Sequence, residues 1–520
     1  MEVIRNSVVG QALLPLWHLL FTYYNDSFLA VCFRTVARSW KRAWRNSVLV
    51  RFCSREGALS RGWKPSVTCR GLTLLFNLPG TILHWIYQKL QPVFDSSGFA
   101  RLGFGLVEET PAAVGWLMLA ILVIPYDNWN NAYSLMGFAL LGAFAIAAGM
   151  RKGSPLLDVR SVGPYGVAFA AFVLLAWPLS AYVHLSGRFV YYHLAGMLCV
   201  IIVVSTVERA SQLMRLLGMS TLGLVAMSLY GIYQRIQGIE VNPSYVDLTL
   251  NEGMPGRVFS FYNNPNAFGE VLLLLIPLAV ALMIGSRSWL GRFGGLAGAG
   301  LGCVALVMTY CRAGWIGLMC AAFLFVFLWN RKLLPAFLLL GLACIPFLPD
   351  TVFNRILTIF NFSDSSTSSR FPLYQAALRL LETRPVSGAG LGIDAVRTAV
   401  KDLNLYHGAS PFVHSHDVYL QIWAETGILG LLSFLGTMGW TLKKAVRAVW
   451  NGKGDRRIRL TVIGGASAML GILVCGIADF IWHYPRVMLI FWFVFAVTLA
   501  GVRLAFREEK RAAARRIPKS

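Results

Sequence analysis

The chain has 520 residues, of which 56% are hydrophobic and only 14% are charged, and its formal net charge is +23. Soluble domains usually carry roughly a quarter charged residues, so this composition excludes a chain made of soluble domains alone. The chain contains repeated apolar runs whose lengths approach or reach the ~20 residues needed to cross a bilayer. The runs are continuous rather than alternating, which excludes a membrane β-barrel and predicts an all-α, polytopic transmembrane helical bundle.

The first 112 residues differ from the rest of the chain. They contain 13 Lys/Arg against 6 Asp/Glu, interleaved with aromatic residues such as Trp40, Trp44 and Trp63. Apolar stretches such as Leu72–Leu78 are too brief to span a bilayer. Basic residues with aromatic anchors favour helices that lie in the headgroup region, so we expect residues 1–112 to form a membrane-surface region. A cytoplasmic region that docks a partner is the alternative interpretation.

Twelve spans are predicted after this region, nine of them within residues 113–348 and three within residues 418–505. Their approximate limits are 113–126, 131–150, 165–183, 189–206, 212–235, 264–284, 293–310, 314–329, 333–348, 418–441, 460–480 and 487–504. The first and eighth are short for a span.

Basic residues gather in alternate loops. The loop 442–459 carries seven Lys/Arg and one Asp, and the tail carries seven Lys/Arg from Arg503 onward. If these loops are cytoplasmic, both termini are cytoplasmic, and residues 506–520 form a basic cytoplasmic tail of a protein in the cytoplasmic membrane. The positive charge then reflects topology and anionic membrane lipids, and we expect no nucleic-acid partner.

The opposite, outward side holds a large loop over residues 349–417. Within it, Phe371–Glu382 has the pattern of an amphipathic helix, and the Ser- and Asp-rich stretch 361–369 is typical of a flexible segment. Gly388, Gly390 and Gly392 indicate a tight backbone passage. The nine cysteines show no metal-ligand spacing, and we expect neither a metal nor another cofactor.

The short outward segments have few basic groups, and Arg257 and Arg312 stand out among them. The large loop has several, of which we single out Arg370 because it opens the predicted helix, and His414 and His416 lie at the outward mouth of the tenth span. Four separate regions of the chain thus bring cationic or titratable groups to the outward side. The planar guanidinium of arginine suits phosphate oxygens, and histidine is the usual general base near neutral pH. Together they suggest transfer chemistry on a lipid diphosphate. Taken singly, an arginine at the end of a span is more often a headgroup anchor, and a loop histidine is more often solvated.

Three further polar residues have a structural as well as a functional interpretation. Asn266 follows Pro265 at the start of a predicted span and could be a helix cap. Asp479 and His483 lie near an outward span end and could form a structural pair.

Four motifs give the chain a resemblance to the O-antigen ligase and O-antigen polymerase (WaaL/Wzy-C) superfamily. They read RVFSFYNNPNAFGEVLLLLIP, CRAGWIG, SRFPLYQAALRLLETRPVSGAGLGI and HSHDVYLQIWAETGILGLL. The resemblance is strongest over residues 255–435, and the layout of spans extends it to about residue 505. The order and the spacing of the four motifs make it more specific than any one of them, and residues 1–112 lie outside it.

The resemblance implies a GT-C-like glycosyltransferase that works without metal and moves a glycan from undecaprenyl diphosphate to a hydroxyl acceptor. His416 takes the position of the catalytic base, and Arg257 and Arg312 take positions thought to bind the diphosphate, with Arg370 as a third. Asp417 departs from the family pattern, which has Asn, Ser or Gln after the histidine in the ligases. An acidic residue there could orient His416 or reflect a different acceptor, so ligase and polymerase both stay open.

Two alternatives remain beside this interpretation. A protein O-oligosaccharyltransferase of the same superfamily would need a protein acceptor, of which the sequence gives no sign. A transporter or transport partner would usually show inverted repeats and broken polar helices in the membrane. No clear repeat is visible, and the sixth to ninth predicted spans are almost free of charge.

Overall fold

The computed structural model describes residues 46–152, 157–242, 253–358, 368–408, 411–452 and 454–515, with a few isolated positions before residue 46. The chain divides into two compact units, Met1–Gly57 and Ala58–Ser520. The described part of the first unit contains helix α4 (Val48–Ser54). The second unit contains all the residues discussed below. Throughout the described residues every regular element is a helix and none is a strand, which confirms the predicted all-α class.

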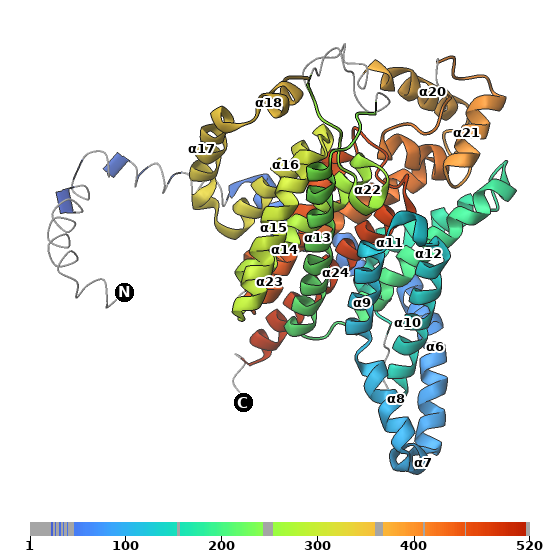
Figure 1. Cartoon of the computed structure of the whole chain (residues 1–520). Coiled ribbons are helices and arrows are strands. Elements are labelled where there is room, and N and C mark those ends of the chain that lie inside the picture. Colours follow the sequence, from blue (N-terminus) through green and yellow to red (C-terminus); the bar gives the residue numbers. More distant parts are fainter. Residues whose placement is uncertain are drawn as a thin grey trace. The chain divides into compact units, whose positions relative to one another are not determined.

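Ten helical segments of the described residues are long and apolar enough to cross a membrane. An eleventh is possible if α8 (Gly98–Glu108) and α9 (Thr110–Val123), which meet at 60°, form one bent span. The ten are α10 (Asn131–Lys152), α11 (Val159–Ala176), α12 (Val183–Thr206), α13 (Ala210–Gln237), α14 (Pro265–Gly285), α15 (Trp289–Met308), the run 312–347, α22 (Val418–Asn451), α23 (Arg456–Cys475) and α24 (Pro485–Ala514) (Figure 1).

Twelve spans were predicted, and ten or eleven segments of the described residues meet this criterion of length and composition. The eighth and ninth predicted spans form the single run 312–347, which contains α16 (Arg312–Asn330), η4 (Arg331–Leu333), α17 (Leu334–Cys344) and η5 (Ile345–Phe347). With 11 residues, α17 is only about 17 Å long, too short to span alone. The chain nevertheless returns to the face where α16 begins. This return is shown by a hydrogen bond of 2.9 Å that Arg312 Nη1, at the start of α16, donates to the Thr358 carbonyl.

Three helices form the centre of the second unit. The most apolar window of α24 is fully buried, and those of α14 and α23 are each 83% buried, whereas that of α15 is only 28% buried. Helices that are apolar on all sides belong in the interior of a bundle. Small residues let neighbouring helices approach closely. A Cβ at Gly317 of α16 would lie 2.7 Å from the Gly471 carbonyl oxygen of α23, and one at Gly471 would lie 2.6 Å from that of Gly317.

Residues 58–112 pack on one side of this bundle. Trp63 Nε1 donates to the Arg160 carbonyl over 3.2 Å, and Trp440 Nε1 donates to Ser60 Oγ over 2.8 Å. The helices here are α5 (Ala58–Trp63), α6 (Val67–Lys89) and α7 (Gln91–Ser96), followed by α8. The short apolar stretch noted in the sequence, Leu72–Leu78, lies inside the 23-residue helix α6.

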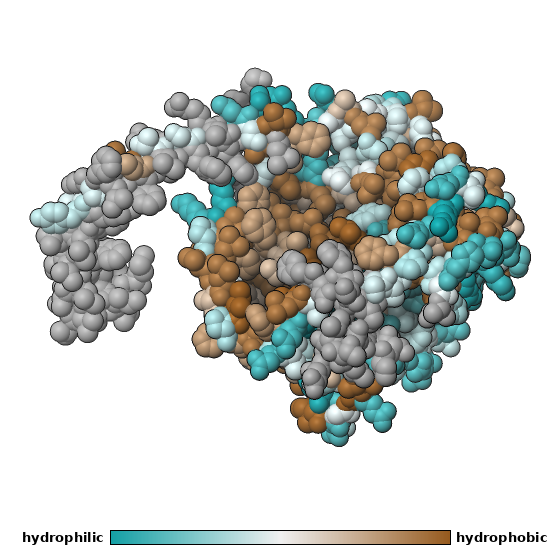
Figure 2. Space-filling model, turned by 90° about the horizontal axis from the view of Figure 1, so that it is seen from above, coloured by the Kyte–Doolittle hydropathy of each residue, from teal (hydrophilic) through white to brown (hydrophobic). Residues whose placement is uncertain are grey.

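One end of the second unit carries the helices of the large loop (Figure 1). They are α18 (Asp350–Leu357), α20 (Arg370–Thr383) and α21 (Ile393–Asp402), so the predicted helix Phe371–Glu382 is confirmed. Seen from this end, hydrophilic residues lie mostly towards the edge and hydrophobic residues fill much of the middle (Figure 2). Most of the Ser-rich stretch predicted to be flexible lies outside the described residues.

The predicted tight passage is confirmed by its backbone. Gly388, Gly390 and Gly392 all have positive φ, between 67° and 120°. The first of them lies against a break in α22 at Gly427, where φ is 74°. The Ala389 N–H donates to the Ala424 carbonyl over 2.7 Å, and a Cβ at Gly427 would lie 1.7 Å from the Val386 carbonyl oxygen. The loop is therefore held against α22 just after the segment that carries His416.

Two short helices complete the described elements. They are η1 (Tyr126–Asn128) and η3 (Ser260–Tyr262), which lie in connections between spans. The helix α11 begins six residues before the predicted span, because Asp158 caps it and a break at Gly163, with φ of 86°, is accommodated within it.

Candidate active site

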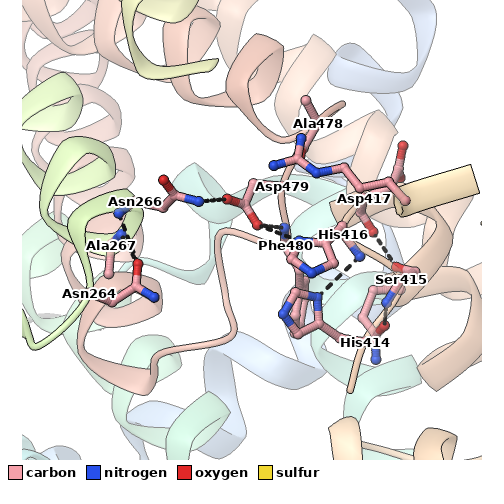
Figure 3. A network of polar contacts seen from close by, with 12 residues as sticks. Asn264, Asn266, Ala267, His414, Ser415, His416, Asp417, Ala478, Asp479 and Phe480 are labelled. Atoms are coloured by element: carbon pink, nitrogen blue, oxygen red, sulfur yellow. Dashed lines mark hydrogen bonds and ion pairs between the residues drawn. The ribbon is translucent and has the colours of Figure 1, made fainter. Parts of the chain in front are cut away.

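Polar side chains from separate parts of the chain meet at the end where α20 and α21 lie. Figure 3 shows a continuous path of contacts from Asn264 through Asn266 and Asp479 to His416 and His414. The residues come from the start of α14, the segment before α22, and the connection between α23 and α24. The structure thus brings together residues up to 213 positions apart, as in the contact of Asn266 with Asp479.

The centre of this network is the pair formed by His416 and Asp479. His416 Nδ1 lies 3.3 Å from Asp479 Oδ1, and 30% of the His416 side chain remains exposed while only 10% of Asp479 does. Burial by itself raises the pKa of Asp479, but the hydrogen bond with His416 and nearby positive charges outweigh it and hold this pKa below its ordinary value. An ionised carboxylate only accepts, so Nδ1 is the donor and Nε2 is the nitrogen left to take a proton.

His416 adopts an unusual backbone conformation to make this contact. Its φ is +50°, in the left-handed region that residues other than glycine rarely occupy. Its N–H donates to His414 Nδ1 over 3.1 Å, and its carbonyl accepts from the Tyr374 hydroxyl over 3.5 Å. Such strain, of order 1–3 kcal/mol, persists where surrounding contacts fix the conformation, and it is common at functional sites.

His414 and His483 lie beside this pair as neutral rings. The centroid of the His414 ring is 4.0 Å from that of His416 and 4.6 Å from that of His483. Burial, together with the neighbouring His416 and His483, moves the pKa of His414 well below its ordinary value. Burial also lowers the pKa of His483. A structural pair of His483 with Asp479 was one interpretation of the sequence, and the ion pair that Asp479 forms is with His416.

Asn266 and Arg257 extend the network towards α14. Asn266 Nδ2 donates to Asp479 Oδ2 over 3.0 Å, and its Oδ1 accepts from Arg257 Nη2. Arg257 Nε also donates to the Thr309 carbonyl over 2.6 Å, which ties Arg257 to the turn before Arg312. Burial lowers the pKa of Arg257 to about 10, so the residue still carries its charge at neutral pH.

Two residues act as helix caps, and one of them differs from expectation. Asn264, rather than Asn266, is the N-cap of α14, because its Oδ1 accepts from the N–H groups of Asn266 and Ala267. Asp417 is the N-cap of α22, where its Oδ1 accepts from the N–H groups of Tyr419 and Leu420 over 2.8 and 2.7 Å. The carboxylate that contacts His416 is therefore that of Asp479.

The remaining predicted arginines lie at helix starts on the same face. Arg370 begins α20, and its Nη1 donates to the Ala478 carbonyl over 2.6 Å, next to Asp479. Arg312 begins α16, beside the tight turn at Tyr310, whose φ is +51°. The charges of Arg312 and Arg370 both contribute to lowering the pKa of Arg257, after the larger effect of burial. The guanidinium group of Arg257 is therefore within electrostatic range of both other groups.

Polar residues that were not singled out in the sequence hold the histidine segment in place. Gln421 accepts from the Ser415 N–H over 3.1 Å and donates to Glu425 over 2.9 Å. Both side chains are buried, and so is Glu270, one turn after Asn266 in α14. An ionisable residue inside an apolar helix is a usual sign of function, and this signal could have identified Glu270 and Glu425.

Among the described residues, no group of three or more His, Cys, Asp or Glu side chains is arranged to hold a metal ion. A family model described as O-antigen ligase matches residues 297–435. This match supports membership of the O-antigen ligase superfamily. The matched range contains Arg312, Arg370 and His416, whereas Arg257 and Asp479 lie outside it. No curated protein matches the sequence.

The match over residues 297–435 supports a general activity and setting. It supports a multi-pass membrane enzyme of the glycosyltransferase kind, with glycan transfer like that of O-antigen ligases and polymerases and a lipid-linked glycan as substrate. The network around His416 lies at one end of the helices and includes residues from both inside and outside the matched range.

Proposed function

We propose that the protein transfers a glycan from an undecaprenyl-diphosphate carrier to a hydroxyl acceptor at the outer face of the cytoplasmic membrane. The observation that carries this proposal is the pair of His416 and Asp479, with the His416 side chain 30% exposed, beside the charges of Arg257, Arg312 and Arg370. A base and a cluster of phosphate-binding groups are the two parts that this reaction needs.

In the proposed reaction, His416 acts as the general base. Its Nε2 takes the proton of the acceptor hydroxyl while the hydroxyl oxygen bonds to the anomeric carbon of the carrier-linked sugar. Asp479 accepts from Nδ1 and stabilises the imidazolium that forms, as carboxylates do beside other catalytic histidines. The carboxylate stays ionised because its pKa is held below the ordinary value, so this stabilisation is available at neutral pH.

The arginines would act on the other side of the reacting carbon. The bond between that carbon and the diphosphate breaks, and the electron pair leaves on undecaprenyl diphosphate. Arginine forms paired, charge-assisted hydrogen bonds to phosphate oxygens. These hydrogen bonds strengthen as negative charge develops on the leaving group. In this scheme the guanidinium groups neutralise the leaving group, so the reaction requires neither a metal nor a nucleotide sugar.

The direct test is product analysis with the full-length protein reconstituted in liposomes that contain an undecaprenyl-diphosphate glycan. Mass spectrometry of the products should show free undecaprenyl diphosphate. Longer lipid-linked chains would identify a polymerase, and glycan on a different hydroxyl acceptor would identify a ligase. Glycan found only on added protein would favour an oligosaccharyltransferase. An intact substrate would contradict the proposal, and solute flux in liposomes without lipid diphosphate would favour a transporter.

A matched pair of variants on α20 tests the role of the arginines. Arg370→Gln removes a guanidinium at the network, whereas Arg379→Gln removes one from an exposed position on the same helix. Hydrogen bonds to charged groups contribute about 1.5–3 kcal/mol, so Arg370→Gln should lower kcat/KM by about 10- to 150-fold. Equal activity of the two variants would exclude Arg370 from diphosphate binding.

A further inference from the structure

A polar cavity lies at the end of the bundle away from the network of His416. It is lined by residues of α24 from Leu499 to Lys510, whereas the candidate active site lies next to the start of this helix at Pro485. An α-helix rises 1.5 Å per residue, so Arg503 is about 27 Å along α24 from Pro485. The two sites are therefore separated by nearly the thickness of a membrane, and the reaction proposed above does not use this cavity.

Positive charge dominates the described lining of this cavity of about 460 Å³. Two acidic residues, Asp158 and Glu208, face six basic residues: Lys64, Arg160, Lys444, Arg503, Arg507 and Lys510. The side chains of Lys64, Arg160, Arg507 and Lys510 are exposed, so they can reach a ligand without moving the core. An excess of cations around a hollow favours an anionic ligand.

Arg503 shows that the cavity is more than an exposed basic surface. It is only 7% exposed, and its Nη1 lies 3.6 Å from Asp158 Oδ2. Its Nη2 donates to the Val207 carbonyl, but its buried Nε has no hydrogen-bond partner in the described structure. A buried donor without an acceptor costs free energy, and a phosphate oxygen in the cavity is the kind of acceptor that a guanidinium fits.

An apolar groove continues from the cationic cavity into the helices. The groove has a volume of about 360 Å³ and lies among α6, α11, α12 and α24. Residues that line the groove are direct chain neighbours of residues that line the cavity. Leu72 lines the groove and Thr73 lines the cavity. Val159 lines the groove, and its neighbours Asp158 and Arg160 line the cavity.

The same adjacency holds one helical turn apart on the longer helices. Ile201 of α12 lines the groove and Ser205 the cavity, while Phe495 of α24 lines the groove and Leu499 the cavity. Residues at i and i+4 are neighbours on a helix face, so the two hollows adjoin along both helices. The combined site has a cationic mouth and a hydrocarbon-lined interior, as an amphiphile with an anionic headgroup requires.

We propose that this composite site binds one anionic phospholipid, with its phosphate in the cationic cavity and an acyl chain in the apolar groove. The groove explains why the occupant is a lipid rather than free phosphate, because each buried CH₂ adds favourable transfer free energy. The excess of basic residues explains why the lipid is anionic rather than zwitterionic. With the topology predicted from the loops, this lipid belongs to the cytoplasmic leaflet.

The charge requirement is tested with the full-length protein, delipidated in detergent and titrated with phosphatidylglycerol or with phosphatidylethanolamine of the same acyl chains. Native mass spectrometry gives the bound fraction. The variant Arg507→Gln/Lys510→Gln removes two exposed charges from the lining, and Arg511→Gln/Arg515→Gln removes two exposed charges at the end of the same helix, outside the lining.

The wild type should bind phosphatidylglycerol more tightly than phosphatidylethanolamine. A basic residue near a membrane surface contributes about a fivefold change in affinity for anionic lipid, so the first double variant should bind phosphatidylglycerol about 30-fold more weakly. The second should bind it nearly as well as the wild type. Equal losses in both variants, or no preference between the two lipids, would overturn the proposal.

The groove is tested with a second matched pair. Ala171→Phe places a large side chain in the groove from its exposed side, and Ala336→Phe places one on exposed α17, away from the groove. Only the first should weaken binding of phosphatidylglycerol. If inorganic phosphate at millimolar concentration displaces the lipid equally from wild type and Ala171→Phe, the site is a phosphate site and the lipid proposal fails. Tighter binding of a polyprenyl phosphate than of phosphatidylglycerol would also overturn the proposed occupant.

Discussion

The substitution Asp479→Asn separates the role of the Asp479 charge from that of its shape. Asp479 Oδ1 lies 3.3 Å from His416 Nδ1, and Oδ2 accepts from Asn266 Nδ2 over 3.0 Å. Asparagine has nearly the same size but no charge, and its amide could donate to Nδ1. The proton of His416 would then move to Nε2, the nitrogen that has to act as the base.

The expected loss follows from the hydrogen bond that changes. Bonds to a charged group contribute about 1.5–3 kcal/mol, and a tenfold rate change corresponds to about 1.4 kcal/mol. Loss of this stabilisation alone predicts a fall in kcat of about 10- to 150-fold, and the change of tautomer would add to it. KM for the lipid-linked glycan should change little, because Asp479 does not contact the diphosphate in the proposed mechanism.

The assay is single-turnover release of undecaprenyl diphosphate by the reconstituted protein, with thermal unfolding measured on the same preparation. Asp402→Asn is the matched control, because Asp402 accepts a hydrogen bond of 2.8 Å from Tyr182 on the same side of the molecule without contacting His416. If folded Asp479→Asn releases the carrier at the wild-type rate, the proposed pairing of Asp479 with the catalytic base is refuted.

Four other expectations follow from the same structure. The depressed pKa of Asp479 stabilises the fold above about pH 4, the ordinary range of an aspartate, so the difference in melting temperature between wild type and Asp479→Asn should be present at pH 5 and shrink as the pH falls below about 4 towards the depressed pKa of the folded carboxylate. Asp417→Asn should keep both stability and activity, because asparagine also caps helices. Asp417→Ala should lower the free energy of unfolding by about 0.5–2 kcal/mol. Loss of activity in the stable Asn variant would assign Asp417 a role beyond capping. Gly427→Ala should lower the melting temperature strongly because its Cβ would lie 1.7 Å from the Val386 carbonyl oxygen, while Gly439→Ala on the same helix, with nothing within 4 Å, should not; similar effects of the two would contradict the described packing. Transfer by protein treated with EDTA and dialysed should equal that of untreated protein, and restoration of a lost activity by a divalent cation would refute the metal-independent scheme.

The sequence predicted the helical class and most of the spans because continuous apolar runs depend only on local composition. It could not predict the course of residues 331–358, since the ninth predicted run is apolar enough for a span but forms only an 11-residue helix, α17. The turn at η4 and the contact of Arg312 with Thr358 decide how α17 follows α16. The pattern of apolar residues predicts neither of these features.

The site shows the same limit at the level of single residues. Arg257 and Arg312 were visible because basic groups are scarce in the short outward segments, and Arg370 and His416 because they lie at the start of a predicted helix and of a predicted span. The partner of His416 could not be identified from the sequence. Asp417 is the acidic residue next to His416 in the sequence, whereas the actual partner, Asp479, is 63 residues away. A carboxylate next to a helix start usually caps that helix, and Asp417 does so, which leaves the tertiary contact to Asp479.

The central claim is that His416 takes the proton of the acceptor hydroxyl, and His416→Asn tests it most directly. Asparagine tolerates the left-handed φ of +50° at this position better than alanine, so the backbone should be preserved while the base is removed. The measurement is release of undecaprenyl diphosphate from a lipid-linked glycan, by mass spectrometry, with wild-type and variant protein in the same liposomes. Removal of a general base predicts a rate about 10²- to 10⁴-fold below that of the wild type. A folded variant that transfers glycan at the wild-type rate would contradict the mechanism.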